Sequence, residues 1–83
     1  MHIELHAHAS ERLSERGATP TEVIETVLHG EQFPANFNRM GFRKVFVYDG
    51  IWQDRAYGHK EVEAIAVEIP TGMLVLTVIT RYF

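Results

Sequence analysis

The chain lacks cysteine, and it has only three prolines and one tryptophan among its 83 residues. Without cysteine there is no disulfide framework and no thiolate zinc site, which argues against a small secreted domain held together by cross-links. No apolar run approaches the roughly 20 residues that a membrane-spanning helix needs. Residues 1–9 carry three histidines and a glutamate where a secretory signal would carry a basic and then an apolar region. We therefore expect a soluble, cytoplasmic protein without membrane contacts.

The length and composition indicate one globular domain, residues 1–83, since the chain has room for a single hydrophobic core. Apolar residues make up 46% of the chain, and the formal net charge is -3, which argues against a surface that coats nucleic acid generally. Positive charge is nevertheless concentrated in residues 39–60, where five basic residues accompany two aspartates. We expect an anionic ligand to meet this region through Arg43, Lys44 and Arg55.

Two short helices are predicted in the first third of the chain. The first covers His8–Arg16 and ends at Gly17, a residue type typical of helix C-termini. The second begins at the capping box Thr19–Glu22, which has a proline at the first helical position, and ends at Gly30. It carries Val23, Ile24, Val27 and Leu28 on one face.

The rest of the chain reads as strands after a loop that contains Phe33, Pro34, Ala35 and Asn36. The predicted strands are Phe42–Tyr48, Ile51–Tyr57, Val62–Ile69 and Met73–Tyr82. Asp49-Gly50 is a typical hairpin turn between the first two strands, and residues 70–72 join the last two. We therefore predict an α+β fold in which two N-terminal helices pack on one face of a four-stranded, mainly antiparallel sheet.

The last predicted strand is apolar on both sides. Alternation places Leu74, Leu76, Val78, Thr80 and Tyr82 on one side, and Met73, Val75, Thr77, Ile79 and Arg81 on the other. Two short helices can cover only one face of a sheet. We therefore expect a second copy of the chain to cover the other face and form a homodimer.

A stripe of basic residues follows the first helix. On a helical wheel, His8, Arg12 and Arg16 fall beside the buried face that Ala9 and Leu13 define. Cations between a helix and a sheet need an anionic partner or water. One interpretation is structural, with the arginines paired to Glu15, Glu31 or Glu63. The other is a phosphate site where His8 exchanges protons and the hydroxyl groups of Thr80 and Tyr82 lie nearby.

Two motifs carry a resemblance to a known family. The helix reads His-Ala-x-x-Arg-Leu-x-x-Arg-Gly over residues 8–17, and the chain closes on Val-Ile-Thr-Arg-Tyr over residues 78–82. Both resemble small uncharacterised bacterial and phage-associated domains, which are grouped by fold analogy with the RelE- and BrnT-type ribonuclease toxins. The resemblance implies a RelE/barnase-like fold, RNA or ribosome-associated RNA as substrate, and an antitoxin protein as partner. It also implies a site formed by His8, Arg12, Arg16, Thr80 and Tyr82, with no metal and no cofactor.

The implied reaction is metal-independent RNA cleavage. A base removes the proton of a 2′-hydroxyl group, the oxygen attacks the adjacent phosphorus, and an acid protonates the leaving 5′-oxygen. In this scheme His8 is the acid or the base, and Arg12 and Arg16 bind the phosphate. Tyr82 is an alternative base, or a ring on which a nucleobase stacks.

Two other functions stay open at this stage. One is a non-catalytic interaction module that binds an acidic or phosphorylated partner through the same His8, Arg12 and Arg16 seam. The other is a metal site at His2, His6 and His8, because His-x-His places two imidazoles on one side of a strand. The helical position predicted for His8 turns it away from His6, so we predict no metal site there.

Overall fold

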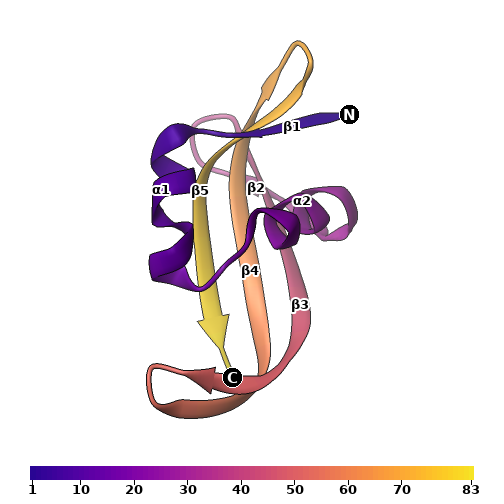
Figure 1. Cartoon of the computed structure of the whole chain (residues 1–83). Coiled ribbons are helices and arrows are strands. Elements are labelled where there is room, and N and C mark those ends of the chain that lie inside the picture. Colours follow the sequence, from indigo (N-terminus) through magenta and orange to yellow (C-terminus); the bar gives the residue numbers. More distant parts are fainter.

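The computed structural model describes the whole chain, residues 1–83, as one mixed sheet with the second helix in front of it and the first helix beside the last strand (Figure 1). The elements are β1 (His2–Leu5), α1 (Ala7–Arg16), α2 (Pro20–His29), β2 (Glu31–Ala35), β3 (Arg39–Trp52), β4 (Arg55–Ile69) and β5 (Gly72–Tyr82). The strand order is β1-β5-β4-β3-β2, and only the β1–β5 pair is parallel. The predicted α+β class is confirmed, whereas the predicted four strands are corrected to five. Neither helix is long and apolar enough to cross a membrane.

The two strands that sequence reasoning missed are short and lie at the sheet edges. β1 has only Ile3 and Leu5 as apolar residues, and it pairs with Gly72–Val75 at the other end of the chain. β2 contains Pro34, which pairs with Met40 of β3. Proline is tolerated there because the edge side of a strand has no partner for an N–H group. The segment predicted as a loop is therefore mostly an edge strand.

The predicted hairpin turn at Asp49-Gly50 is wrong, and so is the separate strand predicted over Ile51–Tyr57, because this segment contains the end of β3, a turn and the start of β4. β3 continues through these residues, and the register with β4 shifts between Val47 and Gly50. The chain instead turns at Gln53 and Asp54, whose φ angles of 49° and 67° lie in the left-handed region. Two consecutive residues of positive φ are typical of tight hairpin turns. β3 and β4 consequently form one long hairpin that extends beyond the helices (Figure 1).

The helix boundaries follow local signals. In the capping box, the Glu22 N–H donates to Thr19 Oγ1 at 3.1 Å and the Thr19 N–H donates to Glu22 Oε1 at 2.9 Å, as predicted. α1 begins after His6, whose Nδ1 accepts from the His8 N–H at 3.2 Å, and ends at Gly17 with a left-handed φ of 72°. A single turn of chain, Gly17–Thr19, therefore separates the two helices.

One core lies between the helices and the sheet. Its members are Leu13, Ala18, Val23, Val27, Phe42, Val62, Ala64, Ala66, Met73, Val75 and Val78. In β5 these residues break the expected alternation, because the register with β4 shifts so that Ala66 pairs with Val75 while Ile65 pairs with Thr77. The extra residue is Leu76, and such a bulge reverses which residues face the core. The predicted sides of the last strand are therefore wrong beyond Leu76.

We expect Gly17→Ala to destabilise the fold by about 2 kcal/mol or more, since a non-glycine residue resists this φ and its Cβ would collide with Tyr82 and Trp52. Gly58→Ala is the matched control, because nothing lies within 4 Å of a Cβ there and its effect should stay within about 0.5 kcal/mol. Urea denaturation of both variants measures the difference. Equal stabilities would contradict the packing assigned to Gly17.

Candidate functional site

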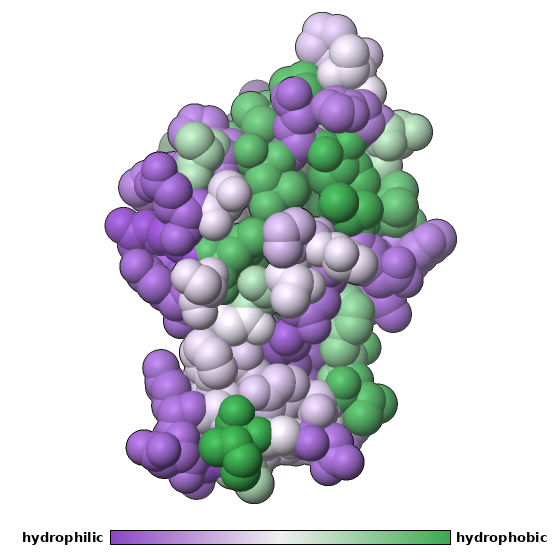
Figure 2. Space-filling view, viewed as in Figure 1, coloured by the Kyte–Doolittle hydropathy of each residue, from purple (hydrophilic) through white to green (hydrophobic).

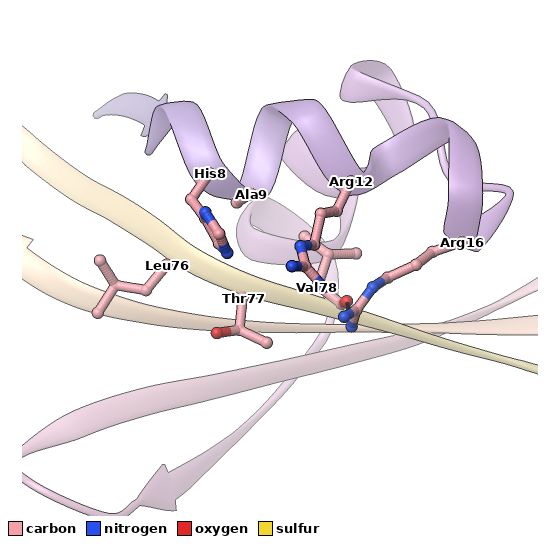
Figure 3. Close-up of a pocket in the computed structure, with 7 residues that line it drawn as sticks. All are labelled: His8, Ala9, Arg12, Arg16, Leu76, Thr77 and Val78. Atoms are coloured by element: carbon pink, nitrogen blue, oxygen red, sulfur yellow. Dashed lines mark hydrogen bonds between the residues drawn. The ribbon is translucent and has the colours of Figure 1, made fainter.

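A groove separates α1 from the middle of β5. It has a volume of about 200 Å³ and is lined by His8, Ala9, Arg12, Arg16, Leu76, Thr77 and Val78 (Figure 3). The groove exists because β1 accompanies β5 only as far as Val75, where the His6 N–H donates to the Val75 carbonyl at 2.8 Å. From Leu76 onward, α1 lies beside β5 in place of a strand.

The basic stripe of α1 forms one wall of this groove. Ala9 and Leu13 are each only 4% exposed, so the adjacent stripe of the helix lies at the boundary between core and solvent. Figure 3 shows the side chains of His8, Arg12 and Arg16 directed from the helix toward β5. The structure thus brings these three predicted residues together.

The arginines of the groove have no carboxylate partner. The ion pairs of the structure use other cations. Of the three glutamates suggested as structural partners, Glu31 pairs with Arg43 at 3.7 Å and Glu63 with Arg81 at 3.5 Å, while Glu15 forms no ion pair. Arg16 Nη1 instead donates to the Val78 carbonyl at 2.6 Å. Two guanidinium charges in one groove repel each other, and an anion bound between them would relieve this repulsion.

Thr80 and Tyr82 lie outside the groove and attach the end of α1 to β5. The Thr80 hydroxyl donates to the Arg16 carbonyl, and the Tyr82 hydroxyl donates to the Gly17 carbonyl at 3.1 Å. Thr77, which sequence reasoning did not select, is the threonine of β5 that lines the groove.

Tyr82 is enclosed by aromatic rings. The ring of Trp52 stacks on it at 4.9 Å between centroids, and the ring of Tyr48 meets it edge-on at 5.0 Å. Burial is the largest cause that raises the pKa of Tyr82 above 10.0, followed by the charges of Tyr48 and Glu22. Tyr82 is therefore a neutral phenol at neutral pH, which suits its role as a hydrogen-bond donor and not a role as a base.

The basic residues of the central segment do not converge on the groove. Arg43 lies over the ring of Phe33 at 4.1 Å, Lys44 near the ring of Phe46 at 5.1 Å, and Arg55 near the ring of Tyr57 at 5.9 Å. The predicted substrate-binding residues therefore lie on β3 and at the start of β4, and none of them lines the groove.

Lys60 is one of the five basic residues of segment 39–60, and its charge is neutralised by a buried ion pair with Glu22. It is only 5% exposed, and its Nζ lies 2.7 Å from Glu22 Oε2 and donates to the Gly17 carbonyl at 2.9 Å. This ion pair holds the start of α2 against β4. Sequence reasoning missed it, because the two residues are 38 positions apart.

The N-terminal histidines do not form a metal-ligand set. His6 Nδ1 accepts from the backbone of His8, and His2 lies 3.5 Å from Glu4. No group of three or more histidine, aspartate or glutamate side chains in the chain is placed to hold a metal ion.

Comparison with known proteins finds no match, neither to a family model nor to a curated protein or a solved structure.

The raised pKa of Tyr82 predicts a loss of stability in alkali. The folded state retains the phenolic proton that the unfolded state releases near pH 10, so this contribution is complete below that pH and is lost as the pH rises through the folded-state value. We expect Tyr82→Phe to weaken this pH dependence and to lower stability at neutral pH by about 1 kcal/mol through the lost hydrogen bond. Urea denaturation from about pH 8 to 11 tests both effects. Parallel stability curves for the two proteins would contradict the assignment.

Proposed function

We propose that this chain is a metal-independent endoribonuclease whose site is the groove between α1 and β5. One observation carries the proposal: His8, Arg12 and Arg16 line a single groove, and neither arginine is paired with a carboxylate. This combination supplies a proton-exchanging group beside two phosphate-binding groups. The helix motif and the α+β fold are consistent with the resemblance to RelE- and BrnT-type toxins, and we extend the proposal to a RelE/barnase-like fold.

In the proposed reaction, Arg12 and Arg16 bind the non-bridging oxygens of one RNA phosphate. His8 accepts the 2′-hydroxyl proton as the oxygen attacks phosphorus, and the bond from phosphorus to the 5′-oxygen breaks. Because the groove is open to solvent, a water molecule protonates the departing 5′-oxygen, and the hydroxide that remains takes the proton back from His8. The products are a 2′,3′-cyclic phosphate and a 5′-hydroxyl end. The arginines stabilise the negative charge that builds up on the phosphate during attack.

Thr80 and Tyr82 act as positioning residues in this proposal. Their hydroxyl groups are used in hydrogen bonds to the carbonyls of Arg16 and Gly17, at the C-terminus of α1. These hydrogen bonds set the distance between β5 and the side of the groove formed by Arg12 and Arg16, which we call the arginine wall. His8 is then the one imidazole that lines the groove, and we assign proton transfer to it.

The same observation gives weight to a second candidate, a non-catalytic module that binds an acidic or phosphorylated partner. With Thr80 and Tyr82 engaged, the groove offers one proton-transfer group where RNA cleavage commonly uses an acid and a base. A binder needs only Arg12 and Arg16. If the chain is a toxin, we propose that it acts in the cytoplasm and that an antitoxin protein neutralises it by covering this groove.

The proposed activity predicts that purified protein cleaves single-stranded RNA in the presence of a chelator and leaves 2′,3′-cyclic phosphate ends. His8→Ala should abolish cleavage while circular dichroism stays unchanged, because His8 is exposed and contributes little to the core. Arg12→Ala should slow cleavage tenfold or more, since a charge-assisted phosphate contact contributes about 1.5 to 3 kcal/mol. Arg81→Ala is the matched control, because Arg81 pairs with Glu61 away from the groove.

The variants also separate the two candidates. A binding module would cleave no RNA, would retain an anionic ligand in His8→Ala and would lose it in Arg12→Ala. Cleavage that persists in both variants would show that the activity has another source. Neither cleavage nor anion binding by the wild-type chain would reject both functions.

A further inference from the structure

One edge of the sheet is left without a neighbour. β2 pairs with β3 only over Arg39–Arg43, so β3 from Lys44 onward has no strand on its outer side. In Figure 1 this part of β3 forms the edge of the sheet below α2. It is rich in β-branched and aromatic residues, which favour strand pairing.

The backbone of this edge has outward-facing hydrogen-bonding groups. His59 and Phe83 exchange both of their backbone bonds, at 2.8 and 3.0 Å, so the backbone groups of His59 face β5. The backbone N–H and C=O groups of neighbouring residues in a strand point to opposite sides, so those of Lys60 point to β3. Phe46 is the partner of Lys60, and its backbone groups therefore point to β4. Val45 and Val47 must then direct their N–H and C=O groups away from the sheet. Two donors and two acceptors are thus available for another strand.

The other edges of the sheet are protected. β2 has Pro34, β1 has only four residues, and α1 lies beside the open part of β5. At the β3 edge, by contrast, the side chain of Val45 is 48% exposed and that of Val47 is 83% exposed. An apolar edge of this kind favours addition of a further strand.

We propose that two copies of the chain pair through this edge, β3 against β3, in an antiparallel register centred on Phe46. The segment Val45-Phe46-Val47 has the same sequence in both directions, so a two-fold axis at Phe46 places Val45 opposite Val47 of the partner subunit. The two valine pairs then form four backbone hydrogen bonds. Phe46 meets its own copy, and Lys44 lies opposite Tyr48 of the partner subunit, where an ammonium group can contact an aromatic ring.

The bulge in β3 limits this interface to one short segment. The register shift between Val47 and Gly50 bends the strand directly after the self-complementary segment. If β3 continued straight, its next residues would lie opposite the residues of the second copy that already pair with that copy's own β2. The bend directs β3 away from this occupied position. A second copy therefore fits this edge better than a long extended peptide, and the pairing is independent of the proposed nuclease activity.

The experiment uses the absence of cysteine from the natural chain. Residues opposite each other in a non-hydrogen-bonded antiparallel pair have Cα atoms about 4.5 Å apart, within disulfide range. Phe46→Cys should therefore form a disulfide-linked dimer on mild oxidation. Ile51→Cys is the control, because this exposed residue of the same strand would lie about 33 Å from its copy. We expect at least tenfold more cross-linked dimer from Phe46→Cys.

A second pair of variants keeps the test independent of the folding of Phe46→Cys. Val47→Pro removes one outward N–H group without touching the bonds to β4 and should convert a dimer to a monomer in light scattering at micromolar concentration. Val47→Thr retains that group and should stay dimeric. A monomeric wild-type chain would overturn the proposal. So would a dimer that persists in Val47→Pro, which would place the interface elsewhere, such as the sheet face without helices.

Discussion

The attachment of the C-terminus of α1 to the sheet is the interaction on which the fold and the groove both depend. The carbonyl groups at a helix end have no partner within the helix. Here the Gly17 carbonyl accepts from Lys60 and Tyr82, and the Arg16 carbonyl accepts from Thr80. Because Lys60 is buried and paired with Glu22, the same contact also holds α2. Loss of one partner would leave a buried charge uncompensated, which is far more costly than loss of an exposed pair.

This attachment also determines the shape of the candidate site. Lys60 reaches the helix end from β4, and the other two donors, Thr80 and Tyr82, come from the terminal half of β5. The groove lies along the preceding residues of β5. Arg16 contributes to both, since its carbonyl accepts from Thr80 and its guanidinium donates to Val78. Figure 2 shows hydrophilic side chains along the helix side of the molecule, next to a hydrophobic band. Because Ala9 and Leu13 of the same helix are buried, Arg12 and Arg16 lie at the boundary between core and solvent.

The sequence predicted those parts of the molecule that depend on local signals. The capping box at Thr19 and the stop at Gly17 located both helices, and helical periodicity placed the basic stripe beside the core. What it could not predict depends on contacts between distant residues. β1 forms a strand because it pairs with residues 72–75 of β5. The turn lies at Gln53-Asp54 because β3 contains a bulge and continues past Asp49. Thr77 lines the groove in place of Thr80 because the groove lies along the middle of β5, while Thr80 lies further along the strand, beside the end of α1.

The parallel pairing of β1 with β5 joins residues about 70 positions apart through a contact of only four residues. This strand lies at the edge of the sheet, and it contributes only two partly buried apolar side chains, Ile3 and Leu5, to the core. Local opening should therefore begin at β1, and the amide protons of this pair should exchange with solvent before those of the β3–β4 hairpin. Because the His6 amide bonds to β5 directly ahead of α1, each such opening also loosens the first turn of the helix, which carries His8. The end of the groove at His8 should thus open more readily than the end at Arg16, which is attached to β5 by two hydrogen bonds.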